Sequence, residues 1–296
     1  MSSLDELELG VMFWAKPDPL ETIREVKSFG VRCGQLGIPG DFPLKGAADK
    51  WQTALEAEKF QVVTVFCAYD GESYADVPTV QRTVGLVPES TRTAREQRTR
   101  EVSDFAAELG VKSIACHVGF IPELVENQGP TSEYLAIRDT VRGIAEYAAR
   151  NGQTFAMETG QEPAEELLKF LAQVNQPNVG VNFDPANMIL YGTGDPLNAL
   201  DLLSAHVLSV HAKDGQWPAK RGSTVLGCET PLGEGAVGIE AFLSKLQLIG
   251  YKGTIHVERE VEDPEERRRD IAAGLQLLRG LLEKEVGRRS QVSYSS

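Results

Sequence analysis

Eight runs rich in apolar and β-branched residues recur along the chain, and amphipathic stretches separate them. Runs of this length and composition predict buried strands, while apolar residues at helical spacing predict helices that cover them. The alternation of the two is typical of parallel βαβ units. The predicted strands cover residues 7–14, 31–38, 62–69, 113–120, 154–159, 179–184, 207–213 and 254–258.

One amphipathic stretch follows each predicted strand. Asp18 and Asp195 each precede a proline, as N-cap residues do, and Gly30, Gly110 and Gly250 follow the ends of helical patterns. Eight strand and helix pairs predict an α/β fold with a single (β/α)8 TIM barrel. A doubly wound open sheet is disfavoured, because no glycine-rich phosphate turn follows the first strand. The predicted helices cover residues 19–29, 47–59, 90–109, 132–150, 163–174, 196–204, 238–249 and 264–284.

The domain organisation follows from the continuity of this pattern. No linker rich in glycine or serine divides the 296 residues, so we expect one barrel domain over residues 1–286. A long connection, residues 215–235, follows the seventh predicted strand. Residues 287–296 form a polar C-terminal tail that has little apolar surface to bury, and we expect it to be frayed.

The formal net charge of −13 disfavours nucleic acid as a partner, because nucleic-acid-binding proteins present a basic face to the phosphates. The richest basic stretch, residues 92–100, has the pattern of a solvated helix face. The sequence has no CxxC pair, no signal-peptide pattern and no apolar run that could span a bilayer, which favours a cytoplasmic protein with free thiols and no membrane partner. Association into a homo-oligomer stays open. The cysteines are Cys33, Cys67, Cys116 and Cys228.

Ionisable residues stand where the last four predicted strands end. The active site of such a barrel is built at the C-terminal ends of its strands, so Glu158, Asp184, His211 and Glu258 are expected to converge. Three carboxylates without a cation between them would repel one another. A carboxylate-rich set with one imidazole suits Mn²⁺ first, with Mg²⁺, Co²⁺ or Zn²⁺ as alternatives. The other interpretation is a group of rim salt bridges without a metal.

The order of these residues carries a resemblance to a known family. Glu158 stands in METG, Asp184 in DPANM, His211 in HAKD and Glu258 in HVERE, with a GEG segment between the last two. In this order, and over nearly the whole chain, the sequence resembles the xylose isomerase-like TIM-barrel superfamily, and especially its sugar isomerase and epimerase branch, which includes the ketose 3-epimerases. The resemblance implies that the four residues are metal ligands. It also implies that Glu158 and Glu258 move protons as catalytic acid and base.

Other residues near the strand ends are candidates for contact with a small sugar-like substrate. Asn187 stands where the ketose 3-epimerases carry a histidine, and Trp217 stands where they carry an arginine. For Lys213 we expect a structural ion pair with Glu234 rather than an imine, because metal chemistry makes an imine redundant. His256 is expected inside the barrel by strand alternation. The candidates for substrate binding are His117, Asn187, Lys213, Arg221 and Glu234.

These observations favour a divalent-metal-dependent isomerase or epimerase that acts on a keto-sugar or related polyol through a metal-stabilised enediolate. The differences at Asn187 and Trp217 motivate an alternative, a metal-dependent lyase or dehydratase that acts on a keto-inositol or 3-keto-sugar. A DNA-repair endonuclease of the same superfamily is disfavoured, because its three-zinc cluster is rich in histidine and this chain has 4 histidines. A sugar-binding protein without catalysis is the remaining class.

Overall fold

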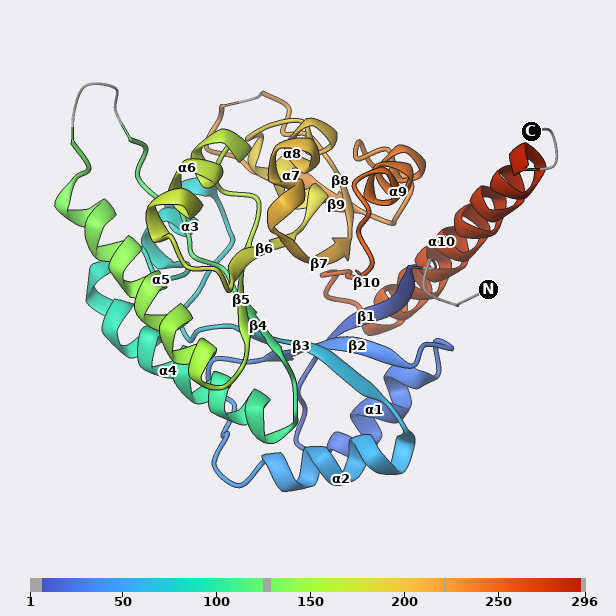
Figure 1. Ribbon diagram of the computed structural model, residues 1–296, viewed down its shortest axis with the longest axis horizontal. Coiled ribbons are helices and arrows are strands. Elements are labelled where there is room, and N and C mark those ends of the chain that lie inside the picture. Colours follow the sequence, from blue (N-terminus) through green and yellow to red (C-terminus); the bar gives the residue numbers. More distant parts are fainter. Residues whose placement is uncertain (1–6, 125–128, 221, 294–296) are drawn as a thin grey trace.

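Eight parallel strands close a barrel in the order β1-β10-β7-β6-β5-β4-β3-β2, which confirms the predicted (β/α)8 fold (Figure 1). The structure is a computed structural model that describes residues 7–124, 129–220 and 222–293, with side chains as far as Lys284. The barrel strands are β1 (Glu8–Trp14), β2 (Cys33–Ile38), β3 (Gln61–Cys67), β4 (Ser113–Cys116), β5 (Thr154–Glu158), β6 (Val179–Phe183), β7 (Val207–Ala212) and β10 (Thr254–Val257).

Helices follow the strands and cover the outside of the barrel. The carboxylates of Asp18 and Asp195 accept hydrogen bonds from backbone N–H groups in the first turns of α1 and α8, as their positions before proline predict. Among the described residues, no helix is long and apolar enough to cross a membrane. The helices are α1 (Pro19–Lys27), α2 (Ala48–Glu58), α3 (Val77–Thr83), α4 (Glu89–Glu108), α5 (Ser132–Arg150), α6 (Ala164–Val174), α7 (Pro185–Tyr191), α8 (Pro196–Leu203), α9 (Ile239–Leu248) and α10 (Pro264–Ser293).

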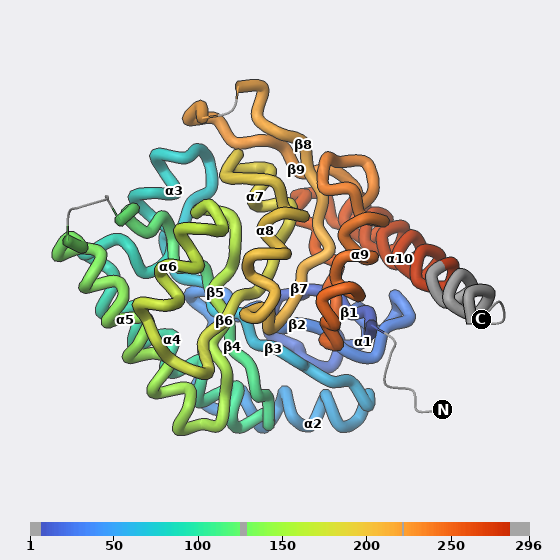
Figure 2. Tube along the Cα trace, turned by 45° about the horizontal axis from the view of Figure 1, so that its top comes forward, coloured from blue at the N-terminus to red at the C-terminus, as the bar shows by residue number. Residues whose placement is uncertain are grey.

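Several segments differ from the sequence-based expectation. The short helices α3 and α7 were not predicted, because each spans only 7 residues and so shows too little helical periodicity. The long connection after β7 contains an antiparallel pair, β8 (Asp214–Gln216) and β9 (Cys228–Thr230), which lies beside α7 (Figure 2). Helix α10 continues to Ser293, nine residues beyond the predicted end at residue 284, and residues 294–296 lie outside the described residues.

The basic stretch on α4 is not a solvated helix face, and that prediction is wrong. Arg95 is 6% exposed and donates hydrogen bonds to the backbone carbonyls of Gly85 (2.7 Å) and Asp70 (3.1 Å). Arg92 and Arg98 likewise donate to carbonyls in the loops that precede α4 and follow β2. These loop carbonyls have no strand or helix partner, and the guanidinium groups satisfy them. The arginines therefore stabilise the loops that shape the C-terminal rim.

Strand alternation divides the barrel into an outer and an inner layer. The main hydrophobic core lies between strands and helices, and a small second cluster of Met12, Phe66, Ala115 and Ala156 packs apart from it. Several other inner positions are polar: Gln35, Asn182, Ser209 and His256 are each at most 3% exposed. The expectation that His256 lies inside the barrel is confirmed, since its ring packs 6.4 Å from that of His211. A buried polar layer thus lies directly beneath the rim.

Candidate metal centre and active site

The ends of β5, β6, β7 and β10 bring four ionisable side chains together. Each follows an inward-facing residue by two positions, so alternation also turns it inward. The Nδ1 atom of His211 lies 3.1 Å from Glu158 Oε1, 3.0 Å from Glu258 Oε2 and 3.7 Å from Asp184 Oδ2. One ligand atom from each residue lies within 4.8 Å of all the others. The structure therefore assembles the four residues that the sequence singled out.

Two buried atoms at the centre of this cluster have no hydrogen-bond partner. Asp184 uses Oδ1 to cap α7, accepting from the N–H groups of Ala186 (2.8 Å) and Asn187 (3.0 Å), while its Oδ2 accepts no hydrogen bond from the described residues and lies 3.9 Å from Lys213 Nζ. His211 Nδ1 is also unpaired in hydrogen-bond geometry. Orphaned buried acceptors are costly. Because both atoms face the same carboxylates, the residues fit a divalent cation with oxygen and nitrogen ligands.

The polar layer beneath the cluster orients two of these side chains. Gln35 Oε1 contacts His211 Nε2 and accepts a hydrogen bond from its proton, so Nδ1 is the nitrogen that faces the carboxylates and can bind a cation when its own proton is displaced. Asn182 Nδ2 donates to Glu158 Oε2, and its Oδ1 accepts from Gln35 Nε2 (3.3 Å) and from Ser209. Ligand histidines in metalloproteins are held in this way through their second nitrogen.

The charges in the cluster alter the pKa of each member. Burial raises the pKa of Glu158 to about 7, although His211 counteracts it. Burial also acts on Glu258, but the Lys213 ammonium and His211 outweigh it and lower the pKa of Glu258. Burial alone would lower the pKa of His211, yet Glu158 and Glu258 raise it well above its ordinary value. Protons thus balance the cluster when no cation does, and a metal must displace them.

Lys213 is the second cation of the rim, and its partner was predicted wrongly. Its ammonium is 2% exposed and lies 3.3 Å from Glu258 Oε2, in contact with Glu260 and 3.9 Å from Glu229. Burial would lower the pKa of Lys213, but these carboxylates raise it well above its usual range. Glu234 is exposed, and its described hydrogen bonds are made by its backbone, which accepts from Gln216 at the carbonyl and donates to the carbonyl of Pro231. The expected pair of Lys213 with Glu234 is therefore absent from the described contacts.

A cavity of about 90 Å³ opens above the cluster. Asn187 lines it and donates to Glu158 Oε1 at 3.4 Å. His117 also lines it, and burial lowers the pKa of His117 to about 4, so its ring is neutral near pH 7. The wall includes Trp14 and Phe66, whose rings meet edge to face with centroids 6.4 Å apart. His117, Asn187 and Lys213 are thus positioned to contact a small molecule in this cavity.

The two other substrate-binding candidates are Arg221 and Glu234. Arg221 lies outside the described residues, and Glu234 does not line the cavity. The side chain of Phe13 packs in the outer core against Phe60 with ring centroids 5.8 Å apart. Trp217 is half-buried against the core.

The sequence reasoning missed several residues of the cavity wall. Tyr74 and Glu72 come from the loop after β3, and Tyr191 comes from α7. Glu260 was present in the HVERE segment, two positions beyond Glu258, where an extended chain turns side chains to the same side. Alternation was therefore a usable signal for Glu260 alone. The other three are on elements that the pattern did not predict.

Comparisons with known proteins agree with this geometry. Residues 23–281 match the family model described as a xylose isomerase-like TIM barrel. A xylose isomerase domain protein from Planctomyces limnophilus has a similar structure, with a TM-score of 0.88 and 39% sequence identity over 94% of this chain and 98% of that one. The D-allulose 3-epimerase of Methylomonas sp. has a TM-score of 0.67 and 18% identity over 95% of this chain and 100% of that one, which shows the fold alone.

A relative among curated proteins matches over a shorter region. An uncharacterised protein of Methanocaldococcus jannaschii is 26% identical over 202 residues, which make up 65% of this chain and 66%, just under two thirds, of that protein.

Proposed function

The chain belongs to the xylose isomerase-like TIM-barrel family, and from this premise we propose that it is a divalent-metal-dependent isomerase or epimerase of a keto-sugar or related polyol. The observation that carries the proposal is the pair Glu158 and Glu258 around one candidate metal centre. They come from β5 and β10, which β6 and β7 separate in the barrel. Two carboxylates that approach one cavity from different strands are suited to remove and return a proton.

Glu158, Asp184, His211 and Glu258 would hold the metal, and Mn²⁺ is the first candidate, followed by Mg²⁺, Co²⁺ and Zn²⁺. When bound, such a cation polarises a carbonyl and its neighbouring hydroxyl and so acidifies the C–H bond between them. Asp184 Oδ2 and His211 Nδ1 support this assignment, because both are buried and neither makes a hydrogen bond of suitable geometry with the described residues.

The chain's own residues then divide the work of proton transfer and orientation. Glu258 contacts Lys213 and His211 through Oε2, which holds the carboxylate ionised and able to accept a proton. Glu158 returns a proton from the other side, while Asn187 fixes its Oε1. Lys213 and the neutral ring of His117 are placed to orient substrate oxygens, since both line the cavity.

A lyase or dehydratase that acts on a keto-inositol or 3-keto-sugar is the second candidate. The observation that favours it is the buried ammonium of Lys213, 3.3 Å from Glu258 Oε2. After Glu258 removes the α-proton, an ammonium on the same side can protonate a departing β-oxygen. Asn187 is also an uncharged amide, unlike the histidine expected of a ketose 3-epimerase.

Proton exchange tests the proposal directly. Mn²⁺-loaded protein in D2O should incorporate deuterium at the α-carbon of at least one compound in a broad keto-sugar panel, as measured by NMR, and EDTA should abolish the exchange. Glu258→Gln should slow it at least ~100-fold, whereas Glu262→Gln, an exposed neighbour, should not. Mass spectrometry separates the two candidates, because isomerisation conserves mass and elimination releases water or an aglycone. Absence of exchange across the whole panel would count against both.

A further inference from the structure

The barrel wall is open beside Glu258. Strand β1 pairs with β10 as far as Val11 opposite Val257, so Met12 to Trp14 continue with β2 as their one strand neighbour in the described part of the chain. On the other side of the opening, the N–H of Glu258 donates to the carbonyl of Ala212 at 3.2 Å. The end of β10 therefore follows β7 and leaves β1, which separates the two strands at the rim.

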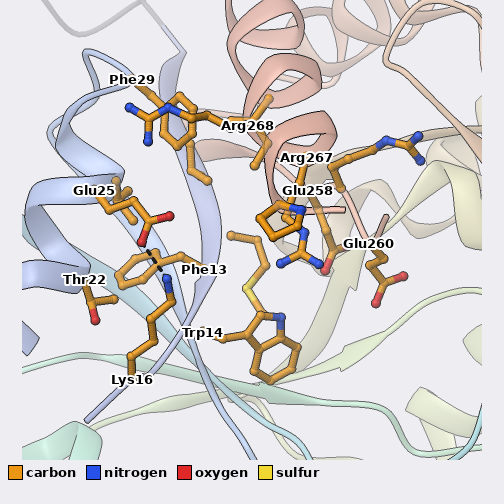
Figure 3. Close-up of a pocket in the computed structure, with 16 residues that line it drawn as sticks. Phe13, Trp14, Lys16, Thr22, Glu25, Phe29, Glu258, Glu260, Arg267 and Arg268 are labelled. Atoms are coloured by element: carbon orange, nitrogen blue, oxygen red, sulfur yellow. Dashed lines mark hydrogen bonds and ion pairs between the residues drawn. The ribbon is translucent and has the colours of Figure 1, made fainter. Parts of the chain in front are cut away.

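A cavity of about 390 Å³ lies at this opening, and we call it the seam cavity. Figure 3 shows its two sides, with Thr22 and Phe29 on one and Arg267 on the other. The lining residues fall at positions i, i+3, i+4 and i+7, which form a single helix face on each side. They are Thr22, Glu25, Val26 and Phe29 of α1 and its C-terminal end, and Pro264, Arg267, Arg268 and Ile271 of α10.

The seam cavity borders the cavity above the metal cluster. Trp14, Glu258 and Glu260 line both of them. Trp14 is 37% exposed and stands at their junction, close to Phe13 and Glu258 in Figure 3. The two cavities therefore adjoin one another beside the candidate ligand Glu258.

The two cavities differ in the size of the group that each can hold. The cavity above the cluster measures about 90 Å³, which is smaller than the ~150 Å³ apolar cavity that binds one benzene molecule. It accommodates the reacting atoms of a sugar rather than a bulky substituent. The seam cavity, at about 390 Å³, falls within the ~300–1,000 Å³ range of ligand pockets. A substituent on the sugar therefore has room in the seam cavity.

Partners among the protein's own residues already occupy the charged groups of the seam cavity. Lys16 pairs with Glu25 at 2.6 Å, and Arg259 pairs with Asp270 at 2.8 Å. Glu260 contacts Lys213, and Arg267 donates to the carbonyl of Val261 at 2.9 Å. Arg268 lies over the ring of Phe29, 5.5 Å from its centroid. The apolar surface that remains for a ligand comes from the rings of Trp14 and the half-buried Phe29, above a floor of nearly buried side chains that includes Met12, Phe13, Val26 and Ile271. Such a surface favours an uncharged flat group over an anion.

We propose that the substrate is a keto-sugar with an O-linked substituent, in the simplest case an aryl glycoside, whose flat apolar part lies in the seam cavity between α1 and α10. This deepens the proposed function, on which it rests, by naming the substrate class. A glycosidic bond occupies the anomeric carbon, so the reacting carbonyl of such a substrate is on another ring carbon. The seam cavity is then the part of the site that selects among keto-sugars.

Binding to the full-length Mn²⁺-loaded protein tests the inference separately from turnover. The phenyl and methyl glycosides of one 3-keto-hexose are compared by calorimetry, and the phenyl compound should bind at least tenfold more tightly. Lys16→Trp fills the cavity from its edge, and Phe29→Ala removes an aromatic wall, so each should reduce this preference to less than threefold. Lys252→Trp, an exposed residue before β10, should leave it unchanged.

The outcomes distinguish the two proposals. Equal affinity of the wild-type protein for both glycosides overturns the inference, even if deuterium exchange is observed. A preference that persists in both Lys16→Trp and Phe29→Ala overturns it too, because the phenyl group then binds elsewhere. A phenyl preference lost in both variants, without deuterium exchange in any compound, supports the seam cavity as a binding site and contradicts the proposed isomerase activity.

Discussion

Asp184→Asn separates the two uses of this side chain. Asp184 caps α7 with Oδ1 and directs Oδ2 at His211 Nδ1, 3.7 Å away. Asparagine caps helices as well as aspartate does, but its Nδ2 is a hydrogen-bond donor and cannot bind a cation. The substitution should therefore preserve the helix start and remove one of the four metal ligands. We therefore expect the substitution to reduce the thermal stabilisation that Mn²⁺ gives to the protein.

The size of the effect follows from linkage. A metal that binds only the folded state at 100 times its Kd stabilises the wild type by ~2.7 kcal/mol. At ~2 °C per kcal/mol for a chain of this length, the Tm rises by about 5 °C. Loss of an outer-shell partner alone weakens metal affinity ~10–100-fold, so loss of a direct ligand should cost at least that much. With Kd raised 100-fold, the stabilisation falls to ~0.4 kcal/mol and the Tm shift to less than ~1 °C.

Thermal unfolding in EDTA and in Mn²⁺ measures these shifts. Asp195→Asn is the matched control, because Asp195 also precedes a proline and caps α8 with Oδ1, but it is exposed and outside the cluster. This control should keep the full Tm rise with Mn²⁺. An equal rise in Asp184→Asn, or no rise in the wild type, would refute the assignment of Asp184 as a metal ligand.

Two further predictions concern groups around the cluster. Gln35→Met removes the acceptor that fixes the His211 tautomer and should weaken Mn²⁺ binding ~10–100-fold in calorimetry, whereas an unchanged Kd would show that Gln35 does not position the ligand. Glu162 is 7% exposed and accepts from the N–H of Ile121 at 2.7 Å, and burial raises its pKa from 4.5 to about 8. The unfolded chain releases this proton near pH 4.5 while the folded chain retains it, so stability is full below pH 4.5 and falls as the pH rises to 8. Glu162→Gln should remove this loss and stabilise the protein by ~4 kcal/mol at pH 8 relative to wild type, with little difference at pH 4. Denaturant titrations that show the same difference at both pH values would contradict the cause.

The fold and the four-residue cluster were predictable because both depend on burial. The apolar runs had to form strands, and alternation fixed which residue at each strand end turns inward. For that reason Glu158, Asp184, His211 and Glu258 meet in the structure as the sequence indicated. Alternation also reaches one step beyond the strand, as far as Glu260. Strand alternation does not predict the direction of side chains on the connecting segments, because the backbone there has no regular repeat.

The predictions that were wrong involve connecting segments, whose path depends on polar contacts. Lys213 was assigned to Glu234, but the Asp214 carboxylate accepts from the N–H groups of Gly233 and Gly235, both at 3.0 Å, and thereby fixes that segment around itself. Glu234 is exposed as a result, and β9 brings Glu229 toward Lys213 instead. The prediction for the arginines of α4 was wrong for the same reason, because their carbonyl partners lie on several loops that no residue pattern identifies.

The seam cavity shows how a local feature of the fold has two consequences for the site. Residue Glu258 leaves the β1 side of the barrel and bonds to β7 through its N–H, and this directs its carboxylate to His211. The same departure leaves Met12 to Trp14 unpaired on that side and opens the wall beside the cluster. A residue at this position that stayed paired with β1 would close this opening. The position of the second glutamate and the room for a substituent are therefore coupled through one backbone hydrogen bond.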